Sequence, residues 1–252
     1  FFYRFLIAYI GIWAISPKHL FADNLKDELW LVAGGVFGGS LYFFTENTAL
    51  GITQASNVAF IICTAPLLTT ILSLLFYKSE KATKGLIYGS LLALIGVGLV
   101  VFNGSVVLKL SPVGDLLTLL AALSWAFYSL VIKRMTGRYP TVFITRKIFF
   151  YGVLTILPAF LLHPLQPDFD VLLQPLVLSN LLFLAVLASL ICYILWNVVL
   201  KQLGTMRASN YIYLNPLVTM VASVLILHEQ ITWITLMGAA CIILGVYLAE
   251  KK

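Results

Sequence analysis

Apolar runs of about 20 residues recur from one end of the chain to the other, and they restrict the possible folds more than any other feature. At about 1.5 Å rise per residue, a helix of this length crosses the roughly 30 Å hydrocarbon core of a bilayer. Runs such as 91–101 and 181–190 lack the alternating pattern of a barrel strand. With 61% hydrophobic and 10% charged residues, the chain is too apolar for a soluble domain. The sequence therefore predicts an all-α polytopic membrane protein.

Charged gaps and gaps that contain Pro or Gly separate nine predicted spans. They cover residues 1–16, 29–50, 54–77, 85–102, 114–132, 141–162, 176–200, 205–227 and 231–249. The connections are short, so no soluble domain interrupts the membrane part. Alternate connections lie on opposite sides of the membrane, and basic residues are retained in cytoplasmic loops. Of the 16 Lys and Arg residues, only Arg4 and Lys109 belong to the connections of one side, and all the others belong to the opposite side. This asymmetry predicts a cytoplasmic C-terminus, and it accounts for the positive net charge without a nucleic-acid partner.

Two stretches of the chain repeat the same landmarks in the same order. The first contains Ala55-Ser56-Asn57, Pro66, Glu80, Gly89 and Gly96, and the second contains Ala208-Ser209-Asn210, Pro216, Glu229, Gly238 and Gly245. Matching positions are 149 to 153 residues apart. The span 114–132 precedes the helix that contains Arg146, whereas no span precedes the matching helix that contains Arg4. We therefore expect a missing first helix and two inverted five-helix repeats, residues 1–110 (helices 2–5) and 111–252 (helices 6–10).

The order of several short motifs resembles one known family. Arg4 begins the first helix, Gly114-Asp115-Leu116-Leu117 leads to Trp125-Ala126-Phe127-Tyr128 and Lys133-Arg134, and a pattern of Pro, Glu and two Gly seven apart occurs twice. This arrangement is similar to the EamA-like branch of the drug/metabolite transporter (DMT) superfamily across essentially the whole chain. The resemblance implies ten helices, both ends in the cytoplasm, and an alternating-access cavity lined by helices 1, 3, 4, 6, 8 and 9. It also implies export of amino acids, other metabolites, nucleotide sugars or drugs.

An acidic residue in the second predicted span is the first candidate for substrate chemistry. Glu46, followed by Asn47, lies in an apolar segment where an ionised carboxylate costs roughly 2.5 to 3.5 kcal/mol. Two interpretations are open. Glu46 is either a site for a proton, a coupling cation or a substrate amine, or a structural carboxylate near the outer end of its helix that is neutralised by hydrogen bonding or paired with Arg4. Trp196 and Asn197 occupy the matching helix of the second half, where the amide either binds substrate or bridges two helices.

Pro66 and Pro216 interrupt matching spans, and paired interruptions of this kind point to a binding site near the bilayer midplane. Each proline removes one backbone hydrogen bond from its helix. The candidate polar residues near them are Asn57, Thr64, Asn210, Tyr211 and Asn215. Trp125 and Tyr128 are three residues apart on one helical face and form a candidate aromatic wall. For all of these residues, a static kink or ordinary packing is the alternative interpretation.

These observations favour a secondary active transporter of a small organic metabolite. Amino-acid-like compounds are the first substrate class, and multidrug or organic-cation export is the alternative. An intramembrane enzyme is not expected, because the three His residues fall at predicted helix ends or loops and no acid-His cluster accompanies them. An ion channel would need a selectivity ring, usually built by several subunits. The isolated Cys63, Cys192 and Cys241 predict no metal site, and no cofactor is expected. The expected partners are the substrate, the lipid bilayer and a proton or other coupling ion, in a monomer or homodimer of a bacterial inner membrane or a plasma membrane.

Overall fold

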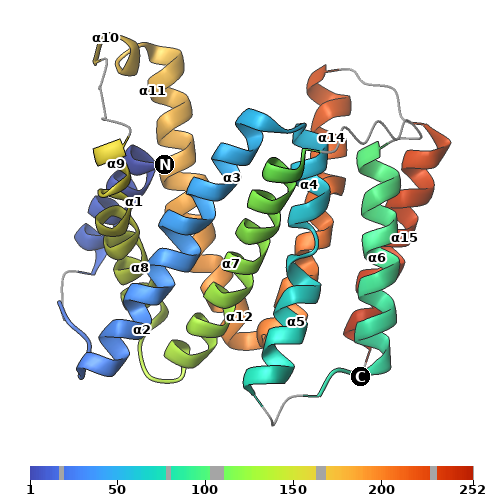
Figure 1. Cartoon of the computed structure of the whole chain (residues 1–252), viewed down its shortest axis with the longest axis horizontal. Helices are drawn as coiled ribbons and strands as arrows, with labels where there is room; N and C mark the ends of the chain where they lie inside the picture. The colour runs from blue at the N-terminus through green and yellow to red at the C-terminus, as the bar shows by residue number, and fades with distance from the viewer. Residues whose placement is uncertain (17–19, 78–80, 103–110, 163–168, 228–231, 252) are drawn as a thin grey trace. The chain divides into compact units, whose positions relative to one another are not determined.

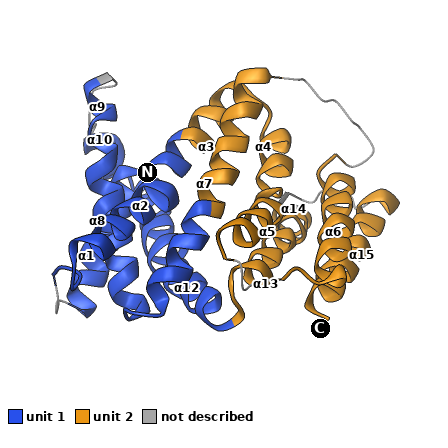
Figure 2. Cartoon of the chain, turned by 60° about the horizontal axis from the view of Figure 1, so that its bottom comes forward, with its two compact units in different colours: residues 1–44, 127–202 blue, residues 45–126, 203–252 orange. Residues whose placement is uncertain are grey.

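The computed structural model describes residues 1–16, 20–77, 81–102, 111–162, 169–227 and 232–251, and every regular element in these ranges is a helix (Figure 1). The repeat landmarks Glu80 and Glu229 lie outside the described residues. The chain forms two compact units, which are residues 1–44 with 127–202 (unit 1) and residues 45–126 with 203–252 (unit 2) (Figure 2). Each unit therefore joins two segments that are far apart in the sequence.

The helices divide between the two units in the following way. Unit 1 contains α1 (Phe2–Ile15), α2 (Leu25–Gly35), η1 (Val36–Ser40), α8 (Thr141–Ile156), α9 (Ala159–Leu162), α10 (Phe169–Leu172), α11 (Pro175–Leu182), η2 (Phe183–Ile191) and most of α12 (Cys192–Leu203). Unit 2 contains α4 (Ala55–Ile62), α5 (Ala65–Phe76), α6 (Lys84–Phe102), α13 (Thr205–Asn210), η3 (Tyr211–Leu214), α14 (Asn215–Leu227) and α15 (Trp233–Glu250). The chain passes from one unit to the other inside α3 (Leu41–Ile52) and α7 (Pro112–Thr136).

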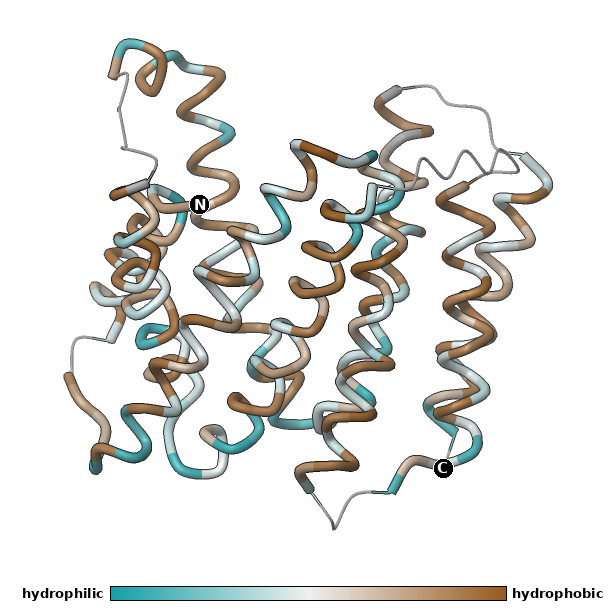
Figure 3. The backbone as a smooth tube through the Cα atoms, in the orientation of Figure 1, coloured by the Kyte–Doolittle hydropathy of each residue, from teal (hydrophilic) through white to brown (hydrophobic). Residues whose placement is uncertain are grey.

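Seven helical segments of the described chain are long and apolar enough to cross a membrane. They are Ala55–Phe76, Lys84–Phe102, Pro112–Thr136, Thr141–Leu161, Pro175–Leu203, Thr205–Ile226 and Trp233–Glu250. The apolar helix α1 is shorter, with 14 residues, and α2, η1 and α3 follow one another without a gap across the predicted span 29–50. Apolar residues run along the helices, while several helix ends are hydrophilic (Figure 3). These spans agree with the prediction of an all-α polytopic membrane protein.

Large apolar side chains are exposed on the outer faces of these helices. The exposed fractions are 70% for Leu75, 85% for Leu161, 71% for Leu225 and 82% for Trp233. Soluble monomers rarely expose contiguous apolar surface of this kind, whereas lipid tails solvate it well. The exposed apolar faces of these helices are therefore suited to contact lipid.

Breaks interrupt three of the predicted spans, and each break lies next to a proline. The span 54–77 divides into α4 and α5 just before Pro66, and the span 141–162 divides into α8 and α9 at Pro158. In the span 205–227, the 3-10 helix η3 ends immediately before Asn215 and Pro216. Proline has no backbone N–H donor, and its ring clashes with the preceding turn. A helix therefore begins at a proline more easily than it continues through one.

Unit 1 has an aromatic core around Phe5, whose side chain is fully buried. Its ring packs against the rings of Phe43, Phe149 and Tyr193, with centroid separations of 5.5, 4.9 and 5.6 Å and nearly perpendicular planes. Edge-to-face pairs at this distance bring the positive ring edge onto the negative ring face. These contacts join α1, α3, α8 and α12 within unit 1.

Two π-helical segments, η1 and η2, lie in the helices that the predicted repeat matches with each other. A π-helical turn leaves backbone groups that need partners from elsewhere in the fold. The Tyr193 hydroxyl donates to the Gly38 carbonyl of η1 at 2.6 Å. Arg4 donates to the Ser189 hydroxyl and, at 3.3 Å, to the Ala188 carbonyl of η2. Side chains from neighbouring helices therefore stabilise both widened turns.

Unit 2 is organised around the close contact of α6 with α15 (Figures 1 and 2). A Cβ atom built on Gly96 would lie 2.6 Å from the Gly238 carbonyl oxygen, and one built on Gly238 would lie 2.8 Å from the Gly96 oxygen. Small residues allow membrane helices to approach until their backbones touch, which maximises van der Waals contact where no hydrophobic effect operates between helices. Val97 and Ile242 are buried beside this contact.

Candidate functional site

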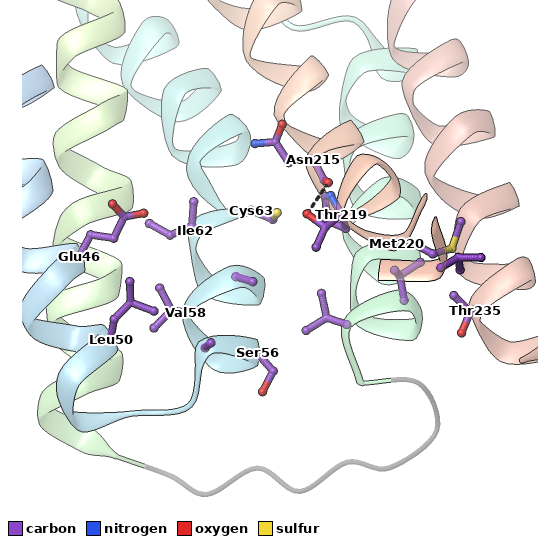
Figure 4. A pocket seen from close by; sticks show the side chains of 16 residues that line it. Glu46, Leu50, Ser56, Val58, Ile62, Cys63, Asn215, Thr219, Met220 and Thr235 are labelled. Carbon is purple, nitrogen blue, oxygen red and sulfur yellow. Dashed lines mark hydrogen bonds between the residues drawn. The ribbon is translucent and has the colours of Figure 1, made fainter. Parts of the chain in front are cut away.

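A cavity of about 740 Å³ lies within unit 2 (Figure 4). We call it the Glu46 cavity and define it by its lining, which is Glu46 and Leu50 from α3; Ala55, Ser56, Val58, Ala59, Ile62 and Cys63 from α4 and the residue after it; Val100 and Val101 from α6; Asn215, Pro216, Thr219, Met220 and Val224 from α14; and Thr235 from α15. Small-molecule sites are commonly mostly apolar and about 300 to 1,000 Å³ in volume. The cavity has the size and the lining expected of a site for a small organic molecule.

The breaks at the two prolines position opposite walls of the cavity. On one wall, α4 ends at Ile62, and the Ile61 carbonyl accepts hydrogen bonds from the Thr64 N–H at 2.9 Å and from the Thr64 hydroxyl at 2.7 Å. On the other wall, the Thr219 hydroxyl donates to the Asn215 carbonyl at 3.1 Å in the first turn of α14. The cavity thus lies between α4, which ends just before the break at Pro66, and α14, which begins at Asn215 and Pro216.

Glu46 supplies the carboxylate of the cavity lining. It is half-buried on α3, and Figure 4 shows Glu46 and Leu50 on one side of the cavity and Asn215 and Thr219 on the other. Among the residues that the structure describes, the lining also includes the amide of Asn215 and several hydroxyl groups, but no Lys, Arg or His. From the described part of the chain, a bound molecule would therefore meet one carboxylate, an amide, hydroxyl groups and mostly apolar side chains.

The other candidate residues of unit 2 lie at varied positions. Asn57 is buried on α4, and Asn210 is buried on α13, where its side-chain oxygen accepts a hydrogen bond from Ser90 at 2.9 Å. Tyr211 is 37% exposed at the start of η3. Asn47 is exposed on α3, and Trp125 is half-buried on α7; neither residue is part of the cavity lining. The structure thus brings Glu46, Asn215 and Pro216 together in one cavity, whereas these five residues, Thr64 and Pro66 are not part of its lining.

Tyr128 and Asn197, two other candidates, meet in a buried hydrogen-bond chain of unit 1. The Tyr128 hydroxyl donates to the Asn197 side-chain oxygen at 2.7 Å, and the Asn197 amide donates to the Thr145 hydroxyl at 2.9 Å. All three side chains are buried, and they connect α7, α8 and α12. Trp196 is half-buried beside Asn197. The Asn197 amide therefore bridges three helices, which is the structural role considered for it from the sequence.

The first turn of α2 carries an ion pair that the sequence analysis did not identify. Arg138 donates to both Asp27 oxygens at 2.9 and 3.0 Å, and Asn24 and Tyr139 donate to the same carboxylate at 2.9 and 3.1 Å. Burial raises the pKa of Asp27, but these hydrogen bonds and the charge of Arg138 outweigh that effect, so its pKa lies below its usual range. The signal in the sequence was an N-cap Asn three residues before an Asp.

The neighbouring acid, Glu28, forms a second ion pair with Lys147. Tyr151 also donates to Glu28, and the Ala22 backbone N–H donates to it at 2.7 Å. Desolvation raises the pKa of Glu28, but the hydrogen bonds from Lys147 and Tyr151 lower it by more, so the pKa lies below its usual value. Lys147 and Arg146 are both buried, although the sequence analysis assigned them to the cytoplasmic charge asymmetry. The two ion pairs attach α2 to the segment that contains Arg138 and Lys147.

The chain matches the EamA-like transporter family over residues 1–102 and 112–250. It belongs to the EamA-like transporter family. An uncharacterised transporter of Archaeoglobus fulgidus is 28% identical to this EamA-like protein over 255 residues, which cover all of this chain and 86% of the relative. A probable amino-acid metabolite efflux pump of Salmonella typhimurium is 27% identical over 245 residues, covering 92% of this chain and 80% of the relative. The resemblance found in the sequence is therefore confirmed.

A crystal structure with 18% sequence identity superposes on this EamA-like protein with a TM-score of 0.80, covering 98% of this chain and 86% of the other. At this identity the similarity establishes the fold and not the activity. The relatives in sequence are transporters and not enzymes, and the helices are apolar, so this EamA-like protein is an integral membrane transporter.

Four polar or polarisable residues of the Glu46 cavity were not selected from the sequence as site residues: Ser56, Thr219, Met220 and Thr235. Two of them belong to the repeated landmarks, because Ser56 is part of Ala55-Ser56-Asn57 and Thr219 lies three residues after Pro216. Thr219 is also one turn after Asn215, so the two share a helical face. That spacing was the available signal, whereas Met220 and Thr235 carry no pattern that would have distinguished them.

Proposed function

We propose that this chain is a secondary active transporter that exports a small organic metabolite, with amino-acid-like compounds as its substrates. The substrate class rests on the probable amino-acid metabolite efflux pumps among its relatives. The observation that carries the proposal is the Glu46 cavity, whose walls include Glu46 from the predicted first repeat and Asn215 from the predicted second repeat. A pocket shared by two repeats is what an alternating-access carrier requires.

In this mechanism, residues 1–110 and 111–252 act as inverted repeats that exchange conformations, so that a central cavity opens alternately to the two sides of the membrane. Glu46 serves as the site for a coupling proton, another coupling ion or the substrate ammonium group. The breaks before Pro66 and Pro216 supply positions where helices can bend. The basic loops and the C-terminus face the cytoplasm, and the protein acts as a monomer or homodimer in a bacterial inner membrane or a plasma membrane.

The test is a flux assay on the full-length protein in proteoliposomes. Vesicles loaded with an unlabelled metabolite panel are given the matching labelled compounds outside, with and without an imposed pH gradient. We expect saturable counterflow for at least one metabolite, and a carrier coupled to protons will also concentrate that metabolite when the gradient is imposed. Absence of counterflow across a broad panel would refute the proposed function. A rate that rises linearly with concentration and shows no counterflow would favour a channel instead.

The role of Glu46 is tested in the same vesicles with the Glu46→Gln variant. We expect this variant to lose substrate affinity or the response to the pH gradient, because the amide has the size of the carboxylate but no charge. Asp170→Asn is a matched control, since Asp170 is an exposed acid on α10 in unit 1. Unchanged transport rate and pH dependence in Glu46→Gln would remove Glu46 from the mechanism.

A further inference from the structure

Apolar side chains line the Glu46 cavity from two opposite sides. Val58 and Ile62 are one turn apart on α4, so they share a helical face. Met220 and Val224 have the same spacing on α14. Figure 4 shows Val58 next to Leu50 on one side of the cavity and Met220 on the other side. A ligand in the cavity therefore meets hydrocarbon groups on one side and a thioether on the other.

Some hydroxyl groups of the cavity are already engaged in hydrogen bonds within the protein. The Thr219 hydroxyl donates to the Asn215 carbonyl at 3.1 Å, and the Thr235 hydroxyl shares a hydrogen bond with the Thr232 hydroxyl at 2.9 Å. A polar ligand side chain that enters between the apolar walls exchanges its water for contacts with hydrocarbon, which costs free energy. An apolar side chain gains free energy from the same transfer.

The size of the cavity allows a bulky side chain. Its volume of about 740 Å³ lies well within the range of sites that hold small organic molecules. In an apolar pocket, a single methylene group of the ligand changes affinity by about tenfold or more. Met220 is unbranched and flexible, so it can adapt to apolar groups of different shape. The lining is therefore suited to distinguish ligands by the apolar surface of their side chains.

We infer that Val58 and Met220 determine the specificity of the Glu46 cavity, and that they select amino-acid-like compounds with a bulky apolar side chain over those with a polar or a small one. This inference rests on the proposed function and narrows its substrate class. It does not depend on what Glu46 pairs with, because the compared amino acids carry the same ammonium and carboxylate groups. Interactions with those groups cancel in the comparison.

The test compares L-leucine with L-asparagine and L-alanine. The side chains of leucine and asparagine have nearly the same shape but opposite polarity, and alanine is apolar but small. Binding to the purified full-length protein in detergent is measured by isothermal titration calorimetry at neutral pH. We expect leucine to bind at least about tenfold more tightly than either other amino acid, which corresponds to about 1.4 kcal/mol. Equal or tighter binding of asparagine or alanine would overturn the inference, and so would the absence of leucine binding.

Two nearly isosteric variants test the assigned residues. Met220→Gln keeps the length of the side chain and adds an amide, and Val58→Thr keeps its shape and adds a hydroxyl. Each should lower the ratio of leucine affinity to asparagine affinity by about threefold or more, because polar surface replaces apolar surface in the lining. The matched controls are Met237→Gln and Val218→Thr, which change exposed residues outside the lining and should leave the ratio unchanged.

Circular dichroism of each purified variant shows whether it is folded. An unchanged affinity ratio in a folded Met220→Gln or Val58→Thr variant would overturn the inference. If neither variant folds, the comparison of the three amino acids on the unaltered protein still decides whether the cavity selects apolar side chains.

The binding result and the flux result can fail separately. Selective binding of leucine without counterflow of any metabolite would support the inference and refute the proposed function. Counterflow of asparagine or alanine together with no binding of leucine would support the proposed function and refute the inference.

Discussion

Replacing Gly96 by Ala should separate two helices that are in backbone contact. The added Cβ would lie 2.6 Å from the Gly238 carbonyl oxygen and 2.8 Å from the Ile242 nitrogen, while ordinary van der Waals contact begins at 3.4 Å. Both neighbours are backbone atoms of α15, which cannot rotate away as a side chain can. The helices must therefore move apart by most of an ångström, and a gap of roughly 0.5 to 1 Å forfeits about a quarter to a half of each contact energy.

We expect the free energy of unfolding of Gly96→Ala to fall by about 1 to 3 kcal/mol, the usual range for overpacking a close contact. The measurement is SDS-induced unfolding of the full chain in mixed micelles, followed by circular dichroism. Gly51→Ala is the matched control, because no atom lies within 4 Å of the position its Cβ would take on α3. That control should be unchanged or gain up to about 1 kcal/mol from helix propensity.

The reciprocal substitution tests the same geometry. Gly238→Ala places a Cβ 2.8 Å from the Gly96 oxygen, so it should destabilise the protein in the same way. The double variant should lose less than the sum of the single losses, because the first substitution already separates the helices. Wild-type stability of Gly96→Ala, or strict additivity in the double variant, would refute the close contact of α6 with α15.

Three further predictions concern unit 1. Tyr128→Phe should lower the free energy of unfolding by about 1 to 3 kcal/mol, because the buried Asn197 oxygen loses a donor. Lys147→Met should cost about 3 to 5 kcal/mol, because it leaves Glu28 charged and largely buried without its cation. Since the pKa of Asp27 is lowered on folding, its contribution to stability is present above the unfolded pKa near 4 and is lost as the pH falls through the folded pKa. The stability difference between Asp27→Asn and wild type, measured by the same unfolding assay, should therefore shrink below about pH 4.

The first two of these predictions have matched control variants. Tyr9→Phe changes a half-buried tyrosine on α1 and should have no more than a small effect. Lys26→Met removes an exposed lysine from the same turn as Glu28 and should change stability by no more than about 0.5 kcal/mol. A Lys147→Met variant as stable as Lys26→Met, or an Asp27→Asn difference that grows in acid, would contradict the assigned ion pairs.

Much of the fold could be predicted because the bilayer simplifies the problem. Apolar length alone locates membrane helices, and prolines such as Pro66 and Pro216 mark the positions where those helices restart. The π-helical turns could not be predicted, since they depend on partners distant in the sequence, such as Tyr193 for the Gly38 carbonyl. The division into two units was also beyond the sequence, because it depends on which helices pack together and not on where they lie in the chain.

The candidate site was predictable only in part. Glu46 was identifiable because an acid in an apolar helix is costly, and Asn215 because it precedes a repeated proline. Asn197 carried the same kind of signal, yet in the structure it bridges buried helices. A sequence gives the cost of burying a polar group but not the partner that offsets it. For the same reason the sequence places Lys147 only among the cytoplasmic basic residues and does not predict that it is buried beside Glu28.

Unit 2 joins two segments that are far apart in the sequence, and this arrangement has a consequence for biosynthesis. Helix α6 is synthesised well before its partner α15, because α7 to α14 lie between them in the chain. Until α15 has been inserted, the glycine face of α6 lacks the backbone that covers it in unit 2, and this face is open to contacts with other helices. Unit 1 likewise waits for residues as late as 202. Each unit therefore combines segments that are synthesised far apart, and neither can finish folding until its later segment has been inserted.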